Sequence, residues 1–473
     1  MFFAKGVLME KIKAKTNKRK SLFRDVDITG GRLIPAIIIY TIPLVITNLL
    51  QYLYNAADIA VVGNYASAQA VAAVGSTAST VSLVLNIVFG LATGCSILIS
   101  RYVGADDSEN IKKVINTAAA LSILIGIFAL ALGELLAEQM LIITACPENI
   151  FDSAALYLRI YFLGMPAVSF YNYMACVLRA KGDSNRPLVY LTVSGLTNVV
   201  LNVILVSVFH MDVAGVAIAT VVSQYLSAIL LFARLLKLDG ACRLVVSDIR
   251  MSAEMFVKII RYGIPTTVAN LAFCVSNVQV QTVINSYGDM AISGYTATSN
   301  LQSVFIGSFT SAFDVSASSF IGANIGAGDR KRTLRVIACM YIMCLLSTGS
   351  ACVFGILFQD SLINILIPNA PIALGYAKIT AIYSIGFGFL LGVIVVNNKV
   401  VQSFGFTVYQ MVCSVASLCG FRVIWISFVY PSLDSFHGLL VVYPISWLLN
   451  IIAVLPCIIY CIVKYSHGKN FEL

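Results

Sequence analysis

The sequence predicts an all-α integral membrane protein, with twelve transmembrane helices in two six-helix repeats around a central cavity. Composition is the first observation: 59% of the residues are hydrophobic and only 11% are charged, whereas a soluble domain carries roughly 25% charged residues. The second is that apolar runs near or above the roughly 20 residues needed to cross a bilayer recur along the chain. The third is that motifs of the first half recur in the second half. These observations exclude soluble enzymes and soluble binding modules.

Apolar length, more than periodicity, sets the expected spans. They cover residues 33–62, 68–100, 114–136, 153–178, 188–209, 213–236, 264–286, 291–325, 333–357, 372–396, 406–429 and 439–463. Several are longer than a bilayer requires, so we expect them to tilt or to project beyond it. No apolar run precedes Leu33. We therefore expect no cleavable signal peptide, with the first helix serving as the insertion signal.

The positive charges are concentrated in alternate loops between the predicted spans. All but three of the 31 lysines and arginines lie before the first span, in alternate loops with their adjoining helix ends, or after the last span. Lys399 is expected to follow the tenth helix, and only Arg159, Lys378 and Arg422 fall within predicted helices. The positive-inside rule places both termini in the cytoplasm of a multi-pass protein of the plasma (inner) membrane. The net charge of +9 therefore predicts no nucleic-acid partner.

The expected domain organisation follows from these spans. A basic cytoplasmic segment covers residues 1–32, an N-lobe residues 33–236, a cytoplasmic linker residues 237–262, a C-lobe residues 263–463 and a cytoplasmic tail residues 464–473. Within the linker, residues 248–261 have the pattern of a short amphipathic helix lying on the membrane surface.

An internal repeat relates the two lobes. Ile42-Pro43 recurs as Ile264-Pro265, Asn55 recurs as Asn277, and Gly104-Ala105 recurs as Gly326-Ala327, all at an offset of 222 residues. Because each half has six spans, both halves run the same way through the membrane. Such parallel repeats are typical of transporters that work by alternating access, with the substrate site between the lobes.

At this point the sequence resembles the MATE family (multidrug and toxic compound extrusion). The likeness is carried by five stretches, which are residues 42–63, 90–105, 178–187, Asn198-x3-Asn202 with 215–220, and 325–329. The resemblance implies a twelve-helix, two-lobed antiporter that exports small organic, often cationic, compounds in exchange for sodium or protons. We expect a monomer in the lipid bilayer.

Asp58 is the first candidate for chemistry. Among the acids of the chain, only Asp58 and Asp314 fall well inside predicted helices, and an ionised carboxylate at that depth costs roughly 2.5–3.5 kcal/mol on insertion scales. Asn198 and Asn202 share one helix face at i, i+4, and Thr220 adds a hydroxyl. Such oxygens suit a hard cation, although amides also serve as interhelical hydrogen-bond partners.

The resemblance implies that Asp58, Asn198, Asn202 and Thr220 surround the coupling cation, Na⁺ or H⁺. Some members of the family carry an acid where Asn202 stands, so one carboxylate remains here. No other metal or cofactor is expected, because the twelve cysteines form no C-x-x-C pair and the three histidines are scattered.

The C-lobe departs from members that have acids on helices 7 and 10, since Gln279, Gln281 and Lys378 occur there instead. Arg422 lies roughly where Asn198 lies in the repeat. Asp314 is expected to pair with Arg422 or Lys378 in a structural or gating role, or else to contact the drug. Tyr54 and Asn55 complete the set of candidates for substrate contact or gating.

Three alternatives remain open from the sequence. A lipid-linked saccharide flippase shares the architecture but would need a strongly cationic lumen. A channel is disfavoured by the repeat. An intramembrane enzyme is not expected, because the sequence has no catalytic motif with metal-ligand spacing, a nucleophilic serine or paired acids.

Overall fold

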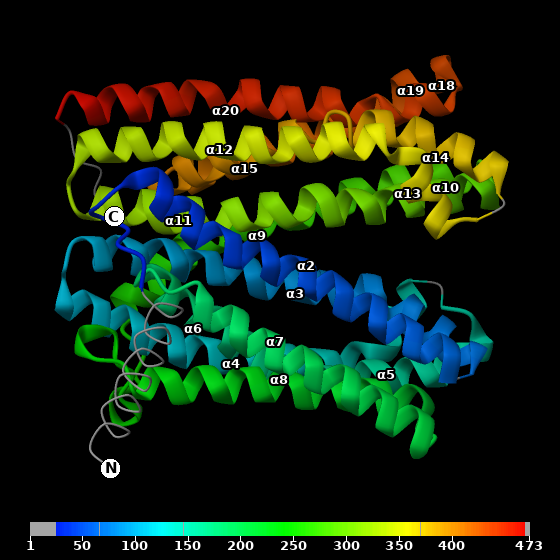
Figure 1. The fold of residues 1–473 in the computed structure, drawn as a ribbon, viewed down its shortest axis with the longest axis horizontal. Coiled ribbons are helices and arrows are strands. Elements are labelled where there is room, and N and C mark those ends of the chain that lie inside the picture. The colour runs from blue at the N-terminus through cyan, green and yellow to red at the C-terminus, as the bar shows by residue number, and fades with distance from the viewer. Residues whose placement is uncertain (1–24, 66, 145, 369, 469–473) are drawn as a thin grey trace, which may run out of the picture.

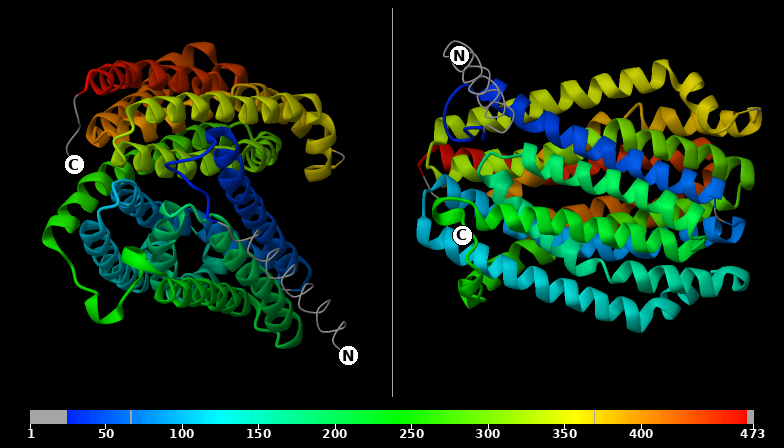
Figure 2. Two further views of the ribbon diagram at one scale, coloured as in Figure 1. Left: turned by 60° about the vertical axis from the view of Figure 1, so that its left-hand side comes forward. Right: turned by 60° about the horizontal axis from the view of Figure 1, so that its bottom comes forward.

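The computed structural model describes residues 25–65, 67–144, 146–368 and 370–468. All regular secondary structure in this part of the chain is helical. The long helices run roughly parallel or antiparallel and form two bundles, coloured blue to green and green to red (Figure 1; Figure 2). This arrangement confirms the predicted all-α class.

The first bundle, the N-lobe, is built from seven helices. They are α2 (Leu33–Tyr65), α3 (Ala68–Gly104), α4 (Ser108–Ile143), α5 (Phe151–Phe162), α6 (Met165–Ala180), α7 (Asn185–Asn202) and α8 (Asp212–Leu236). A π-helical segment, η2 (Val203–Val208), extends α7.

The second bundle, the C-lobe, repeats this plan with more interruptions. Its helices are α9 (Ala253–Asn285), α10 (Asp289–Gln302), α11 (Ser308–Gly326), α12 (Arg330–Leu357), α13 (Gln359–Leu366), α14 (Pro371–Ser384), α15 (Phe389–Ser403), α16 (Thr407–Ser414), α17 (Phe421–Ile424), α18 (Tyr430–Leu433), α19 (Phe436–Leu440) and α20 (Val442–Ser466). π-helical segments η5 (Ser303–Gly307), η6 (Val415–Gly420) and η7 (Trp425–Val429) join several of them into longer spans.

The predicted number of spans is confirmed. Eleven helices of the described chain are long and apolar enough to cross a membrane, and a bent pair makes the twelfth. The pair is α5 with α6, which the sequence predicts as one helix and which meet at an angle of 43°. Gly164 caps α6 and a proline opens it, and a proline is favoured in the first helical turn because its missing N–H needs no partner there.

The linker differs from its prediction. Residues 253–261, predicted as part of a separate surface helix, form the first turns of α9 and continue into the membrane span. No breaker separates the two segments, and Pro265 lies inside the helix without ending it. The linker that remains, residues 237–252, holds only two short 3₁₀ turns.

One end of the molecule, which we call the basic end, carries the loops 105–107, 181–184, 237–252 and 327–329 (Figure 1). Near this end α3 and α11 touch across the lobes through Ser96 and Ser318, whose hydroxyls are 3.2 Å apart and 222 residues apart in sequence. A side chain at Gly104 would overlap the carbonyl of Ala323, and one at Gly326 would overlap the carbonyl of Arg101. These contacts are reciprocal at the same offset, as a two-fold axis parallel to α3 and α11 requires.

The helix α2 links the lobes as it crosses the molecule. Its first half bonds to α11, through Thr41 with Ser316 at 2.9 Å and through the Asn48 amide, which donates to the Ser308 carbonyl at 2.9 Å. Its second half packs on α7, where Tyr54 donates to the Thr192 carbonyl at 3.3 Å. Figure 1 shows α2 running obliquely between the two bundles. Side chains near the end of α2 therefore lie in the N-lobe.

Candidate functional site

The N-lobe brings the four predicted coupling residues together. The Asn202 amide Nδ2 donates to Asp58 Oδ1 at 2.5 Å and lies 3.3 Å from Asn198 Oδ1. The Asn198 Nδ2 in turn lies 3.4 Å from Thr220 Oγ1. Three helices, α2, α7 and α8, thus contribute to one polar chain that ends in a carboxylate.

The burial of this chain leaves one oxygen without a partner. Asn202 is fully buried and Asn198 is nearly so. Because both contacts of the Asn202 amide are made by its nitrogen, Asn202 Oδ1 has no hydrogen-bond partner among the described residues. A buried carbonyl oxygen without a partner is costly unless something else satisfies it. A carboxylate, an amide oxygen and a hydroxyl are the oxygen ligands that a hard cation takes.

The local sequence explains how these groups meet. Gly195 on α7 has no side chain, and the ring of Tyr54 occupies the space that one would fill. This close approach places the end of α2 against the amide face of α7. The π-helical segment η2 begins directly after Asn202, and such segments recur at functional sites. Asn55 follows Tyr54 in α2, but its side chain is outside the part of the structure that can be described.

The C-lobe contains a cavity of about 510 Å³. Helices α9, α10, α11, α15, α16 and α20 line it together with η5 and η6, and Asn86 of α3 is the one described contribution from the N-lobe. The lining combines aliphatic, aromatic, amide and hydroxyl side chains and includes Asn277, the repeat partner of Asn55. Gln279 and Gln281 are not among the lining residues, and Gln281 bonds instead to Asn285 at 2.8 Å.

Arg422 lies in the wall of the C-lobe. Its side chain is fully buried. It donates to Asn277 Oδ1 at 2.8 Å, to Ser276 at 3.2 Å and to Ser446 at 3.0 Å. No acid pairs with it in the described chain, so the predicted pairing of Asp314 with Arg422 is wrong.

Asp314 pairs with a residue that the sequence places elsewhere. Its carboxylate lies 3.1 Å from the ammonium of Lys399, which is only 4% exposed while Asp314 is 40% exposed. Lys399 was expected after the tenth helix, but α15 continues to Ser403 and buries it. Lys378, the other predicted partner, pairs with Asp360 at 2.9 Å, where both side chains are exposed.

A family model named MatE matches the chain twice, over residues 43–204 and 265–427. The two matches fall on the two lobes and cover more than half of the chain. The chain belongs to the MATE family. The expectation that it is a transporter and not an enzyme is therefore confirmed.

Several known proteins are similar to this MATE transporter. A probable multidrug resistance protein, YpnP of Bacillus subtilis, is 31% identical over 308 residues, which are 65% of this chain and 68% of that protein. A probable multidrug resistance protein, NorM of Thermotoga maritima, is 26% identical over 388 residues, which are 80% and 81% of the two chains. A crystal structure of MATE in complex with MaL6 superposes with a TM-score of 0.84 at 20% identity, over 94% of this chain and 99% of that chain. The last likeness establishes a shared fold.

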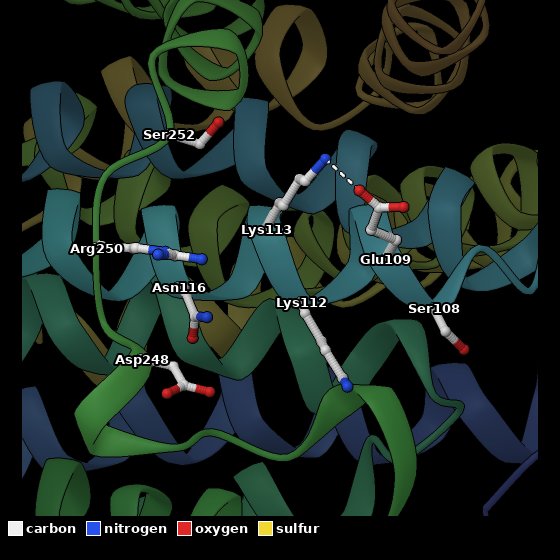
Figure 3. Close-up of a pocket in the computed structure, with 8 residues that line it drawn as sticks. All are labelled: Ser108, Glu109, Lys112, Lys113, Asn116, Asp248, Arg250 and Ser252. Atoms are coloured by element: carbon white, nitrogen blue, oxygen red, sulfur yellow. Dashed lines mark ion pairs between the residues drawn. The ribbon is translucent and has the colours of Figure 1, made fainter.

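A second pocket of about 450 Å³ lies at the basic end of this MATE transporter, outside the two sites above. It lies between the start of α4 and the linker, where Figure 3 shows Glu109 and Lys113 directed toward each other and Arg250 on the linker loop. Glu109 and Lys113 are 2.6 Å apart and partly exposed. The lining carries both signs of charge.

Two residues near the candidate sites were not predicted from the sequence. Asn277 had a visible signal, its match to Asn55 at the repeat offset, but was not assigned a role. Lys399 had none, because Asn397 and Asn398 precede it in a polar run that resembles a loop. The roles predicted for the N-lobe cluster stay predictions.

Proposed function

We propose that this protein is a secondary active multidrug efflux antiporter. In this proposal it exports organic, often cationic, compounds by alternating access in exchange for Na⁺ or H⁺. It resides as a monomer in the plasma (inner) membrane, with both termini and the basic end in the cytoplasm. The relatives of the MATE family named above as multidrug resistance proteins support the substrate class.

The observation that carries the coupling step is the geometry around Asp58. Asp58 ends a chain of amides that leaves the buried Asn202 Oδ1 without a partner in the described structure. Burial raises the pKa of a carboxylate and a bound cation lowers it, so one carboxyl group can hold either a proton or sodium. An ionisable residue inside a membrane-spanning helix is typical of an ion pathway.

Alternating access requires that ion binding favour one arrangement of the lobes. A ligand shifts such an equilibrium only by its differential affinity for the two states. Because α2 bonds to α11 in its first half and carries Asp58 to α7 in its second half, a change at Asp58 acts on a helix shared by both lobes. This connection is a direct physical route from the ion to the lobe interface.

Drug flux in vesicles tests the proposal. Purified protein is reconstituted, and uptake of a fluorescent organic cation is measured under a sodium gradient alone and a proton gradient alone. We expect uptake with one gradient well above the rate without any gradient. Equal uptake with and without gradients would exclude antiport while leaving the fold assignment intact. Drug flux that rises in proportion to drug concentration without saturating would indicate a channel.

A further inference from the structure

The C-lobe cavity differs in charge from an ordinary site for organic cations. None of the described residues that line it is an aspartate, glutamate, lysine or arginine. The nearest ionised group shown by the hydrogen bonds is Arg422, directly behind the lining residue Asn277. Its guanidinium carbon also lies 4.6 Å from the ring centroid of Tyr443 and 5.7 Å from that of Phe273, two further lining residues.

The charge of Arg422 has no counterion in the described chain. Its contacts are two serine hydroxyls, one amide oxygen and aromatic faces, and no ion pair joins it to an acid. Its Nη2 atom is buried and has no hydrogen-bond partner among the described residues. Buried charges in proteins are usually paired because desolvation is expensive. A buried cation with a free donor therefore indicates a missing anion.

Two residues of the cavity lining carry hydrogen-bond donors. Arg422 occupies Asn277 Oδ1, so the amide N–H groups of Asn277 remain as its free polar atoms. Trp447 lines the cavity, is 1% exposed, and its Nε1 has no partner in the part of the structure that is described. Indole nitrogen can only donate a hydrogen bond. Both groups can thus satisfy a negatively charged oxygen.

One unpartnered lining atom is a hydrogen-bond acceptor and not a donor. Asn398 Oδ1 on α15 is a buried acceptor without a partner in the described chain. It is a neutral amide oxygen, so it does not compensate the charge of Arg422, but it can accept a hydrogen bond from the same ligand. The aromatic residues Phe273, Tyr295, Tyr443 and Trp447 supply apolar faces between these polar groups.

We propose that the C-lobe cavity binds the carboxylate of an aromatic organic compound, held by Asn277 and Trp447 and attracted by the charge of Arg422. The proposal extends the proposed function by assigning the binding of anionic ligand groups to the C-lobe. It rests on that function only in taking the cavity as a substrate site. Charge-assisted hydrogen bonds are roughly twice as strong as neutral ones, so these donors favour an ionised carboxylate over a neutral carbonyl group.

Binding to the purified full chain in detergent tests the proposal without any ion gradient. Equilibrium dialysis compares radiolabelled naphthoate with two probes that share its ring, neutral naphthamide and cationic naphthylmethylammonium. We expect naphthoate to bind at least about tenfold more tightly than either probe. Equal binding of the three probes to the unmodified protein would overturn the proposal. Failure of gradient-driven efflux with naphthoate binding retained would reject only the antiport function.

Two variants locate the site. Arg422→Gln should weaken naphthoate binding by roughly 10- to 100-fold, as expected for loss of the attraction between opposite charges in a site shielded from water, and should leave naphthamide unchanged. Asn277→Asp places an acid against Arg422 and should cause a similar loss while keeping the buried charge paired, so it tests the site even if Arg422→Gln folds poorly. Arg159→Gln, which removes an exposed cation paired with Glu138, is the matched control and should bind naphthoate normally. Unchanged naphthoate binding in Asn277→Asp would overturn the proposal.

Discussion

The two lobes are related by an internal repeat, but their candidate sites carry ionised groups of opposite sign. In the N-lobe, Asp58 ends a chain of amides and the unpartnered buried atom is an acceptor, Asn202 Oδ1. In the C-lobe, Arg422 contacts an amide and hydroxyls, and the unpartnered atoms beside it are donors, Arg422 Nη2 and Trp447 Nε1. Neutral polar side chains surround the ionised group in both lobes, but that group lies on α2 in the N-lobe and on α17, near the repeat equivalent of Asn198, in the C-lobe.

This difference indicates that the two sites favour ligands of opposite charge. A site with a carboxylate and a free acceptor favours a cation, and a site with a guanidinium and free donors favours an anion. Both lobes meet at α3 and α11 near the basic end. In our proposal, ligands bound in the two sites therefore act on one interface.

The largest expected effect comes from removing the acid of the N-lobe. Asp58→Asn keeps the size of the side chain but removes the charge that we propose holds the coupling ion. We expect gradient-driven drug flux in vesicles to fall by roughly 5- to 150-fold, the usual range of coupling between two binding sites. The variant should insert and fold normally, since the Asn202 amide can bond to an amide oxygen as well.

Arg159→Gln is the control for that experiment, because it alters an exposed ion pair away from the coupling residues. Full gradient-driven flux in Asp58→Asn would show that coupling does not depend on the N-lobe acid. The residues that couple drug flux to the ion gradient would then have to be sought in the C-lobe.

The next effect concerns stability in the C-lobe. Asp314→Asn leaves the buried Lys399 ammonium without its counterion, which should cost about 3 kcal/mol, the lower end of the range for breaking a buried pair, because Asp314 is itself 40% exposed. Folded yield after detergent extraction should fall more than transport per folded molecule. Fluorescence-detected size-exclusion chromatography measures the yield.

Asp360→Asn is a matched control in the same lobe. It breaks the exposed pair with Lys378, and exposed pairs contribute roughly 0–1 kcal/mol, so yield should hardly change. Normal yield of Asp314→Asn with lost transport would instead assign Asp314 to substrate contact.

The sequence predicted the N-lobe better than the C-lobe for physical reasons. Asp58, Asn198 and Asn202 were found because a lone acid in an apolar run is conspicuous and i, i+4 spacing defines a helix face. Lys399 was missed because it follows two asparagines, and only tertiary packing shows that α15 continues and buries it. Apolar length predicted the number of spans, whereas the bend between α5 and α6 depends on packing around Gly164.

A smaller effect is expected from a neutral member of the N-lobe site. Asn202→Ala removes one oxygen and one donor but leaves the carboxylate, so gradient-driven flux should fall by only about 2- to 10-fold, as expected for an interaction of about 0.5–1.5 kcal/mol. Thr197→Ala on the exposed face of the same helix, where the hydroxyl bonds only to its own backbone turn, should leave flux unchanged. A loss as large as that of Asp58→Asn would mean that the amide, and not the charge alone, defines the site.

The smallest effect on transport comes from a test of the pseudo-symmetry itself. Asp106 and Gly328 lie in loops that the 222-residue offset relates, and both loops lie at the basic end. A cysteine introduced at either position should leave drug flux unchanged, because both loops lie outside the cavity and the N-lobe site. In intact cells both cysteines should resist a membrane-impermeant maleimide and should react after the membrane is opened, whereas a cysteine at Gly288, in the loop between α9 and α10 at the opposite end, should react in intact cells. Labelling of the two basic-end cysteines from opposite sides would contradict a parallel repeat, and with it the correspondence between Asn198 of the N-lobe and Arg422 of the C-lobe.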